Sequence, residues 1–143
     1  TLRQTDACSA MFYCADHGED LYDDRRGRFL HSSPTITYYQ AHVACLGWYS
    51  DEWRAAYPAK AEAAIANTMA PATTHSVFHT VAQLAPIESK YVKSEVSLVS
   101  DGFDCSVERH YLDDHCNARR FGDVGLRQED WGQFAIKGIT DLQ

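Results

Sequence analysis

An apolar run that ends abruptly in charged residues constrains this chain more than any other feature of its sequence. Residues 11–15 read Met-Phe-Tyr-Cys-Ala, and Asp16-His17-Gly18-Glu19 follows directly. A short apolar run bounded by a turn residue is typical of a buried strand. Open α/β sheets place ligand chemistry just beyond the carboxyl ends of their strands, so we expect Asp16 and His17 at such a position. Gly18 would let the backbone turn away sharply there.

Asp16 and His17 have the chemistry of a metal-ligand pair. A carboxylate oxygen and a neutral imidazole nitrogen suit zinc better than calcium or magnesium, which prefer oxygen shells. Adjacent side chains on an extended strand point to opposite faces, so both reach one ion only if the backbone bends at Gly18. The alternative is a strand end with a capping carboxylate and a solvated histidine, because a triplet alone is only a hypothesis.

Further motifs follow this stretch in a defined order. They are Leu30-His31 after a variable loop, Gln40-Ala41-His42-Val43 before a second apolar run, and the segment from Ser76 to Ile87. The ordered set resembles the alkaline phosphatase superfamily, and more narrowly the phosphoethanolamine transferases of bacterial envelopes. These are sulfatase-like enzymes that modify lipid A or core lipopolysaccharide.

The resemblance implies an α/β fold, with a sulfatase/alkaline-phosphatase-like sheet flanked by helices. Residues 1–143 would form the C-terminal part of the catalytic domain. In this family, a threonine nucleophile beside zinc takes phosphoethanolamine from a phospholipid donor and passes it to lipid A or a core sugar. The matching threonine would lie upstream of Thr1, so we expect the isolated chain to be inactive. A sulfatase, a phosphoglycerol transferase or phosphodiesterase, and a non-catalytic binding fragment stay open as alternatives.

The resemblance also assigns roles to four residues of this chain. Asp16 and His17 would be zinc ligands, whereas His31 and Glu19 would be catalytic residues close to the metal or the donor phosphate. No residue matches a site for an organic cofactor. Two protein ligands are fewer than the three or four of most zinc sites, so we expect weak zinc binding by the chain alone.

The charge of the sequence argues against nucleic-acid binding, and its hydropathy argues against a membrane-spanning segment. The formal net charge is -7, from 20 acidic against 13 basic residues, which disfavours nucleic-acid binding. The sequence has no apolar run long enough for a membrane span, so we expect a soluble chain. The resemblance places the parent protein at the periplasmic face of the bacterial inner membrane, held there by a region outside this chain.

Local patterns predict the remaining elements. We expect a core strand at residues 43–49, helices that begin near Ser50 and Pro58, and a helix at residues 75–85 capped by Thr73 or Thr74. A short strand at residues 95–99 and a terminal helix at residues 128–136 would follow. The predicted buried residues are Phe12, Tyr13, Val43, Leu46, Trp48, Phe78, Val81 and Leu84.

Several residues permit both a structural and a functional interpretation. The loop from Leu21 to Arg28 reads as solvated, although one of its arginines could clamp a phosphate. His42 reads as a hydrogen-bonding residue at a strand edge, and the residues from His110 to Cys116 as a strand or turn. His75 and His79 lie at i and i+4, but we interpret them as helix-face histidines.

The five cysteines permit at most partial pairing, because their number is odd. Cys14 and Cys45 lie in predicted strands and are expected to be small buried hydrophobic residues. Cys105 and Cys116 flank a polar segment and could bridge in an oxidising periplasm. No Cys-x-x-Cys motif occurs, which argues against a structural zinc knuckle.

Overall fold

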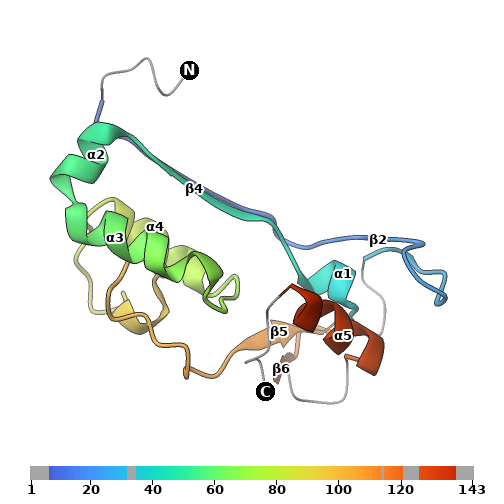
Figure 1. Ribbon diagram of the computed structural model, residues 1–143. Helices are drawn as coiled ribbons and strands as arrows, with labels where there is room; N and C mark the ends of the chain where they lie inside the picture. The colour runs from blue at the N-terminus through green and yellow to red at the C-terminus, as the bar shows by residue number, and fades with distance from the viewer. Residues whose placement is uncertain (1–6, 32–34, 114, 121–125, 138–143) are drawn as a thin grey trace. The chain divides into compact units, whose positions relative to one another are not determined.

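The computed structural model describes residues 7–31, 35–113, 115–120 and 126–137. The chain divides into two compact units (Figure 1). Unit 1 consists of Thr1–Cys14 and Cys45–Val107, and unit 2 consists of Ala15–Ala44 and Glu108–Gln143. No helix in the described ranges combines the length and the apolar character that crossing a membrane requires.

Unit 1 is built from one antiparallel strand pair and a set of helices (Figure 1). Strand β1 pairs with β4, and the register places Phe12 opposite Gly47 and Cys14 opposite Cys45. The elements of the unit are β1 (Ala10–Cys14), β4 (Cys45–Tyr49), α2 (Asp51–Ala56), α3 (Pro58–Ala66), the 3-10 helix η2 (Asn67–Met69), α4 (Ser76–Leu84) and the 3-10 helix η3 (Ser94–Val96).

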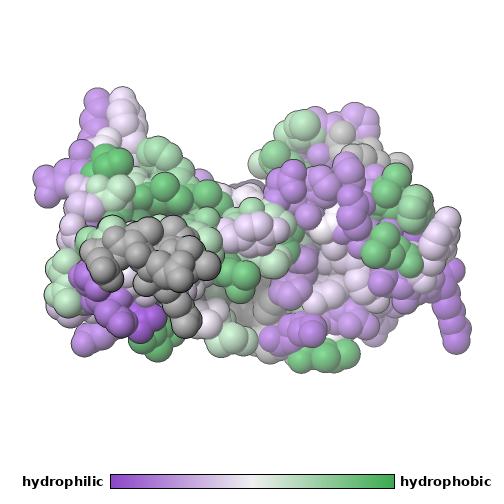
Figure 2. Space-filling model, turned by 90° about the horizontal axis from the view of Figure 1, so that it is seen from above, coloured by the Kyte–Doolittle hydropathy of each residue, from purple (hydrophilic) through white to green (hydrophobic). Residues whose placement is uncertain are grey.

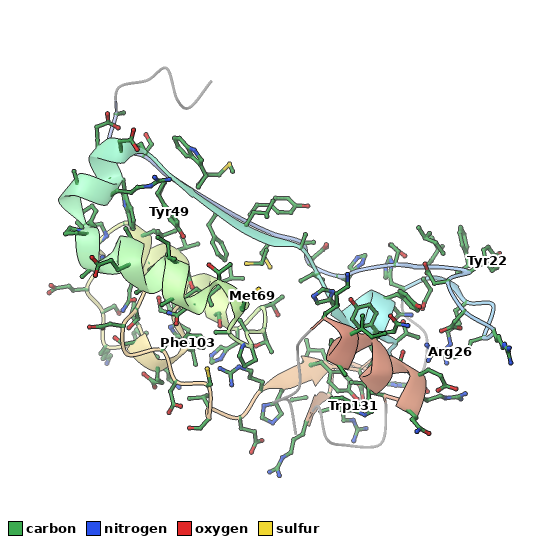
Figure 3. All side chains as sticks on the ribbon, in the orientation of Figure 1. Tyr22, Arg26, Tyr49, Met69, Phe103 and Trp131 are labelled. Carbon is green, nitrogen blue, oxygen red and sulfur yellow. The ribbon has the colours of Figure 1, made fainter. Side chains whose placement is uncertain are left out.

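The core of unit 1 forms around Trp53. The predicted start of α2 is confirmed, since the Ser50 hydroxyl oxygen accepts the Trp53 backbone N–H at 3.1 Å. Trp53 is 2% exposed and packs with Leu84 and Val99. Tyr49, which is labelled in Figure 3, is the last residue of β4. Its ring stacks on the Trp53 indole, with ring centroids 4.7 Å apart. The strand pair therefore buries one face against the helices.

Two of the three core residues predicted for the helix after residue 75 are exposed. Phe78 and Val81 are 57% and 46% exposed, whereas α4 buries Ser76, His79, Thr80, Ala82 and Leu84. The buried polar side chains hold neighbouring backbone, because the Thr80 hydroxyl oxygen accepts the Leu98 N–H at 3.0 Å. His79 Nδ1 likewise accepts the Lys93 N–H at 3.1 Å. These bonds satisfy donors that would otherwise be buried without a partner.

Other predicted core residues also differ from expectation. Tyr13 and Leu46 are 50% and 59% exposed, because they lie on the face of the strand pair opposite Phe12. Phe12, Trp48 and Val43 are half-buried, and Leu84 is buried as predicted. Hydrophobic residues accordingly lie at the surface of both units (Figure 2).

Two local predictions in unit 1 need correction. Helix α4 begins after His75 without a side-chain cap, so neither Thr73 nor Thr74 caps it. The predicted strand at residues 95–99 is instead the 3-10 helix η3 and a turn, in which the Ser97 N–H bonds the Ser94 carbonyl at 3.2 Å. Val96 and Val99 are buried there, so these apolar side chains pack in the core without forming a strand.

Cys14 and Cys45 are less buried than predicted. Cys14 is half-buried and Cys45 is exposed, since both lie at the last rung of the strand pair. Cys105 and Cys116 are exposed, and the disulfide considered between them is not formed.

Unit 2 contains two short hairpins and two helices. The elements are β2 (Asp20–Leu21), β3 (Phe29–Leu30), α1 (Tyr38–Ala41), β5 (His110–Leu112), β6 (Ala118–Arg120) and α5 (Gln128–Ile136). Strands β2 and β3 pair with each other, as do β5 and β6, all antiparallel. Tyr38, Leu126 and Phe134 form the buried cluster of this unit. The predicted terminal helix and the strand after His110 are therefore confirmed.

A buried carboxylate joins three segments of unit 2. Asp130 is fully buried and accepts hydrogen bonds from Arg26 Nη1 and Nη2 at 2.9 and 2.8 Å, and from the Tyr38 N–H at 2.8 Å. Arg26 also pairs with Asp24 and is only 13% exposed. The prediction of a simply solvated loop is therefore wrong for Arg26. Its guanidinium fork binds carboxylates of the chain itself.

Candidate metal centre

The turn after β1 positions Asp16 and His17. β1 ends at Cys14, so both residues follow the carboxyl end of the strand, as predicted. The Gly18 N–H donates to the Gln40 carbonyl at 2.8 Å. A Cβ atom on residue 18 would lie 2.0 Å from the Tyr39 carbonyl oxygen. Only glycine permits this close approach of two backbone segments.

The hairpin of β2 and β3 brings His31 back to the same place. Asp20 is paired with Leu30, so the adjacent residues Glu19 and His31 lie next to each other where the hairpin opens. Leu30 adopts a left-handed backbone conformation with φ 67, which is uncommon for a leucine and directs the chain into His31. Twelve residues apart in sequence, Glu19 and His31 thereby become neighbours.

Three side chains form a compact cluster of metal-ligand types. His31 Nδ1 lies 2.7 Å from Glu19 Oε1, and His17 Nδ1 lies 3.7 Å from the same oxygen. The two imidazole rings are tilted relative to each other, with centroids 3.8 Å apart and an interplanar angle of 32°. One ligand atom from each of the three residues lies within 4.8 Å of the others. Among the described residues, this is the one group of three or more such side chains.

Asp16 lies beside this cluster. Its Oδ2 is 3.7 Å from His17 Nε2, and its Oδ1 accepts the His17 N–H at 3.0 Å. That backbone hydrogen bond and the nearby His17 ring lower the pKa of Asp16, so the carboxylate stays ionised. Its side chain is 89% exposed, whereas those of His17 and His31 are 41% and 42% exposed. The site is open to solvent on the Asp16 side.

The donor set fits a zinc ion. Two imidazoles and one carboxylate match the ligands of catalytic zinc sites, which keep a further position open for water or substrate. Glu19 Oε2 is buried and makes no hydrogen bond within the described part of the chain. A buried carboxylate oxygen without a donor is costly, and a cation would relieve that cost. His17, Glu19 and His31 would hold the ion, with Asp16 alongside.

The structure therefore groups the four predicted residues differently from the sequence. The sequence separated Asp16 and His17, as ligands, from His31 and Glu19, as catalytic residues. In the structure, His17, Glu19 and His31 make the tightest group, and Asp16 is the outermost member.

A second buried carboxylate supports the site and was not foreseen. Asp20 is 3% exposed and follows Glu19 directly. Its Oδ1 accepts the Thr37 hydroxyl at 2.8 Å, and its Oδ2 accepts the Gln40 side-chain amide. Gln40 thus ties the start of β2 to α1, whose first turn is capped by Thr37. Thr37 lies three residues before Gln40 and is of a residue type that commonly caps helices, so the sequence did contain a signal for the start of α1.

The other histidines considered from the sequence have local partners. His42 ends α1, and its Nδ1 lies 2.8 Å from the Tyr38 hydroxyl. Burial lowers the pKa of His42, and the positive charge of Lys137 lowers it further, so the neutral ring is favoured. His75 and His79 contact each other through Nε2 atoms 3.3 Å apart. His79 is buried against the Lys93 backbone, as expected for a structural residue.

Fold and site together define an α/β domain segment with a candidate zinc centre at a strand end. No protein-family model matches the sequence, and no curated protein sequence matches it. The structure is similar to the crystal structure of the C-terminal periplasmic domain of EcEptC from Escherichia coli, with 20% identity and a TM-score of 0.62. That alignment covers 76% of this chain and 30% of the E. coli domain.

The same E. coli domain in complex with Zn is similarly related. The identity is 19%, the TM-score is 0.65, and the alignment covers 80% of this chain and 31% of that domain. The chain thus spans about a third of the length of the solved domains. The likeness shows a shared fold, which confirms the predicted α/β class and the predicted structural resemblance to such a domain. Both neighbours are periplasmic domains of the E. coli protein.

Proposed function

We propose that this chain is the metal-binding C-terminal part of a zinc-dependent phosphoethanolamine transferase. The observation that supports this most is the convergence of His17, Glu19 and His31 on one point. The ordered motifs of the sequence resemble this family, and the E. coli domain with the same fold has been solved with zinc. The pattern of residues, the fold and the donor chemistry all support this function.

Each member of the cluster has a distinct task in this proposal. His17 and His31 would supply imidazole nitrogens, and Glu19 would supply a carboxylate oxygen. Asp16 stays ionised beside His17 and adds a second negative charge to balance the cation. A zinc ion held by these residues would lower the pKa of a hydroxyl nucleophile and neutralise charge on a phosphoryl group.

Substrates follow from the family resemblance. The donor would be a phospholipid that carries phosphoethanolamine, and the acceptor would be lipid A or a core sugar of lipopolysaccharide. The open side of the cluster next to Asp16 would leave room for the donor phosphate. The nucleophile would come from outside this chain, together with the region that holds the parent enzyme at the periplasmic face of the inner membrane.

Zinc affinity of the 143-residue chain tests the metal-binding part of this proposal. Competition with a chromophoric chelator should give one zinc per chain, and His17→Ala and His31→Ala should each weaken binding at least about 10-fold. His75→Ala is the matched control, because it removes an exposed histidine outside the cluster. Equal affinities in all four proteins would refute the proposed centre.

Transfer activity tests the catalytic part. In an enzyme that carries this segment together with its nucleophile, His17→Ala should abolish both zinc binding and transfer of labelled phosphoethanolamine to lipid A. Near-normal transfer in both Asp16→Ala and His17→Ala variants would remove the basis for the assignment. A chain that binds zinc at the cluster while the enzyme hydrolyses sulfate esters would instead support the sulfatase alternative.

A further inference from the structure

Two cysteines face each other across the last rung of the strand pair in unit 1. The register of β1 and β4 places Cys14 directly opposite Cys45. The Ala15 N–H donates to the Ala44 carbonyl at 3.1 Å, and the Ser50 N–H donates to the Ser9 carbonyl at 2.9 Å. In an antiparallel pair, hydrogen-bonded and non-hydrogen-bonded rungs alternate. Cys14 and Cys45 therefore occupy a non-hydrogen-bonded rung.

Rungs of this kind have a spacing that a disulfide can bridge. Opposite residues at such a rung have Cα atoms about 4.5 Å apart, and their side chains are close to each other. Disulfides join Cα atoms roughly 4.4–6.8 Å apart, so the strands can be bridged without moving the backbone. Cys45 is exposed, which gives an oxidant access to the pair.

The position of the pair in the sequence gives a bridge a structural consequence. Cys14 and Cys45 flank residues 15–44, which contain Asp16, His17, Glu19 and His31. We propose that Cys14 and Cys45 are an oxidisable pair whose disulfide closes the segment carrying the candidate metal ligands. This inference does not depend on the proposed transferase activity.

The chemistry is thiol–disulfide exchange with a disulfide oxidant. The Cys45 thiolate attacks one sulfur of the oxidant, forms a mixed disulfide and releases one thiol. The Cys14 thiolate then attacks the Cys45 sulfur, forms the Cys14–Cys45 bond and releases the second thiol. Two electrons pass from the protein dithiol to the oxidant, and the two protein protons end on the released thiols. The closed loop stabilises the folded chain because it limits the freedom of the unfolded chain.

Disulfide mapping of the unmutated chain tests the proposal. The native protein is incubated with oxidised glutathione, quenched with acid, alkylated, digested without reductant and analysed by mass spectrometry. We expect a cross-linked peptide pair joining Cys14 to Cys45, two hydrogens lighter than the separate peptides, with the other cysteines alkylated. Alkylation of both residues, glutathione adducts alone, or pairing with another cysteine would overturn the proposal.

Two variants and a melting curve complete the test. Cys105→Ser should keep the cross-link, whereas Cys45→Ser should lose it and leave Cys14 open to alkylation. Both remove an exposed thiol, so they are matched in their effect on the fold. The oxidised unmutated chain should melt roughly 5–15 °C above its reduced form. An equal or lower melting temperature after oxidation would contradict a bridge that the strand pair accommodates.

Discussion

Replacement of Asp130 should show how much its buried carboxylate stabilises unit 2. Asp130 is fully buried and receives four hydrogen bonds, two from the Arg26 guanidinium and two from the backbone N–H groups of Tyr38 and Arg127. Burial alone would raise the pKa of this carboxyl group. The bonds from Arg26 and from the two N–H groups outweigh burial and hold the pKa below its usual range.

The magnitude follows from these partners. Removing one member of a buried ion pair costs about 3–5 kcal/mol, because the other charge loses its compensation. Asp24 still pairs with Arg26 after the change, so we expect Asp130→Ala to lose about 3 kcal/mol of unfolding free energy. Asp130→Asn keeps an acceptor oxygen for the backbone donors, so its loss should be smaller. Glu129→Ala, an exposed acid in the same helical turn, should lose less than about 1 kcal/mol.

Urea unfolding followed by circular dichroism measures these differences, and pH gives an independent check. The pKa of Asp130 is lower in the folded than in the unfolded chain. The advantage of the unmutated protein over Asp130→Asn should therefore be complete above about pH 5. It should decline as the pH falls below the unfolded pKa of about 3.9 towards the lower folded pKa. Equal losses for Asp130→Ala and Glu129→Ala, or a pH-independent difference, would refute the reasoning.

Three further predictions concern the core, the turn and the activity of the chain. Leu84→Ala should cost about 2–5 kcal/mol in urea unfolding, whereas Phe78→Ala should cost less than about 1 kcal/mol, because only Leu84 is buried; the reverse order would contradict the packing of α4. Gly18→Ala should lose about 1–3 kcal/mol, since its Cβ meets the Tyr39 carbonyl, while Gly132→Ala meets no atom within 4 Å and should lose nothing; equal effects would argue against the tight turn. The isolated chain should transfer no labelled phosphoethanolamine, because covalent transfer needs a nucleophile and the proposed one lies outside this chain. Zinc-dependent turnover by the pure chain would contradict this prediction.

The sequence was informative where local chemistry decides the structure. The apolar run before Asp16 predicted β1 and the position of the candidate ligands, because a strand followed by glycine has few alternatives. Ser50 and Pro58 predicted the starts of α2 and α3 through capping and proline geometry. These signals require no knowledge of distant contacts.

Distant contacts explain what the sequence did not predict. The pairing of Glu19 with His31 depends on a hairpin in which Tyr22 and Leu30 adopt left-handed conformations, and neither residue type favours them. The helix at residues 75–85 was predicted, but which of its faces is buried depends on the backbone N–H groups that bond Thr80 and His79. Asp130 looks like an ordinary acid in a first helical turn until Arg26 reaches it.

Zinc K-edge X-ray absorption on the zinc-loaded chain tests the central claim most directly, because the chain offers imidazoles, carboxylates and five cysteines to the same ion. Binding by His17, Glu19 and His31 predicts only nitrogen and oxygen neighbours at about 2.0–2.2 Å, with the outer-shell scattering of two imidazoles. His31→Ala should remove part of that imidazole signal. Sulfur neighbours at about 2.3 Å, or a spectrum unchanged by His31→Ala, would contradict the proposed centre.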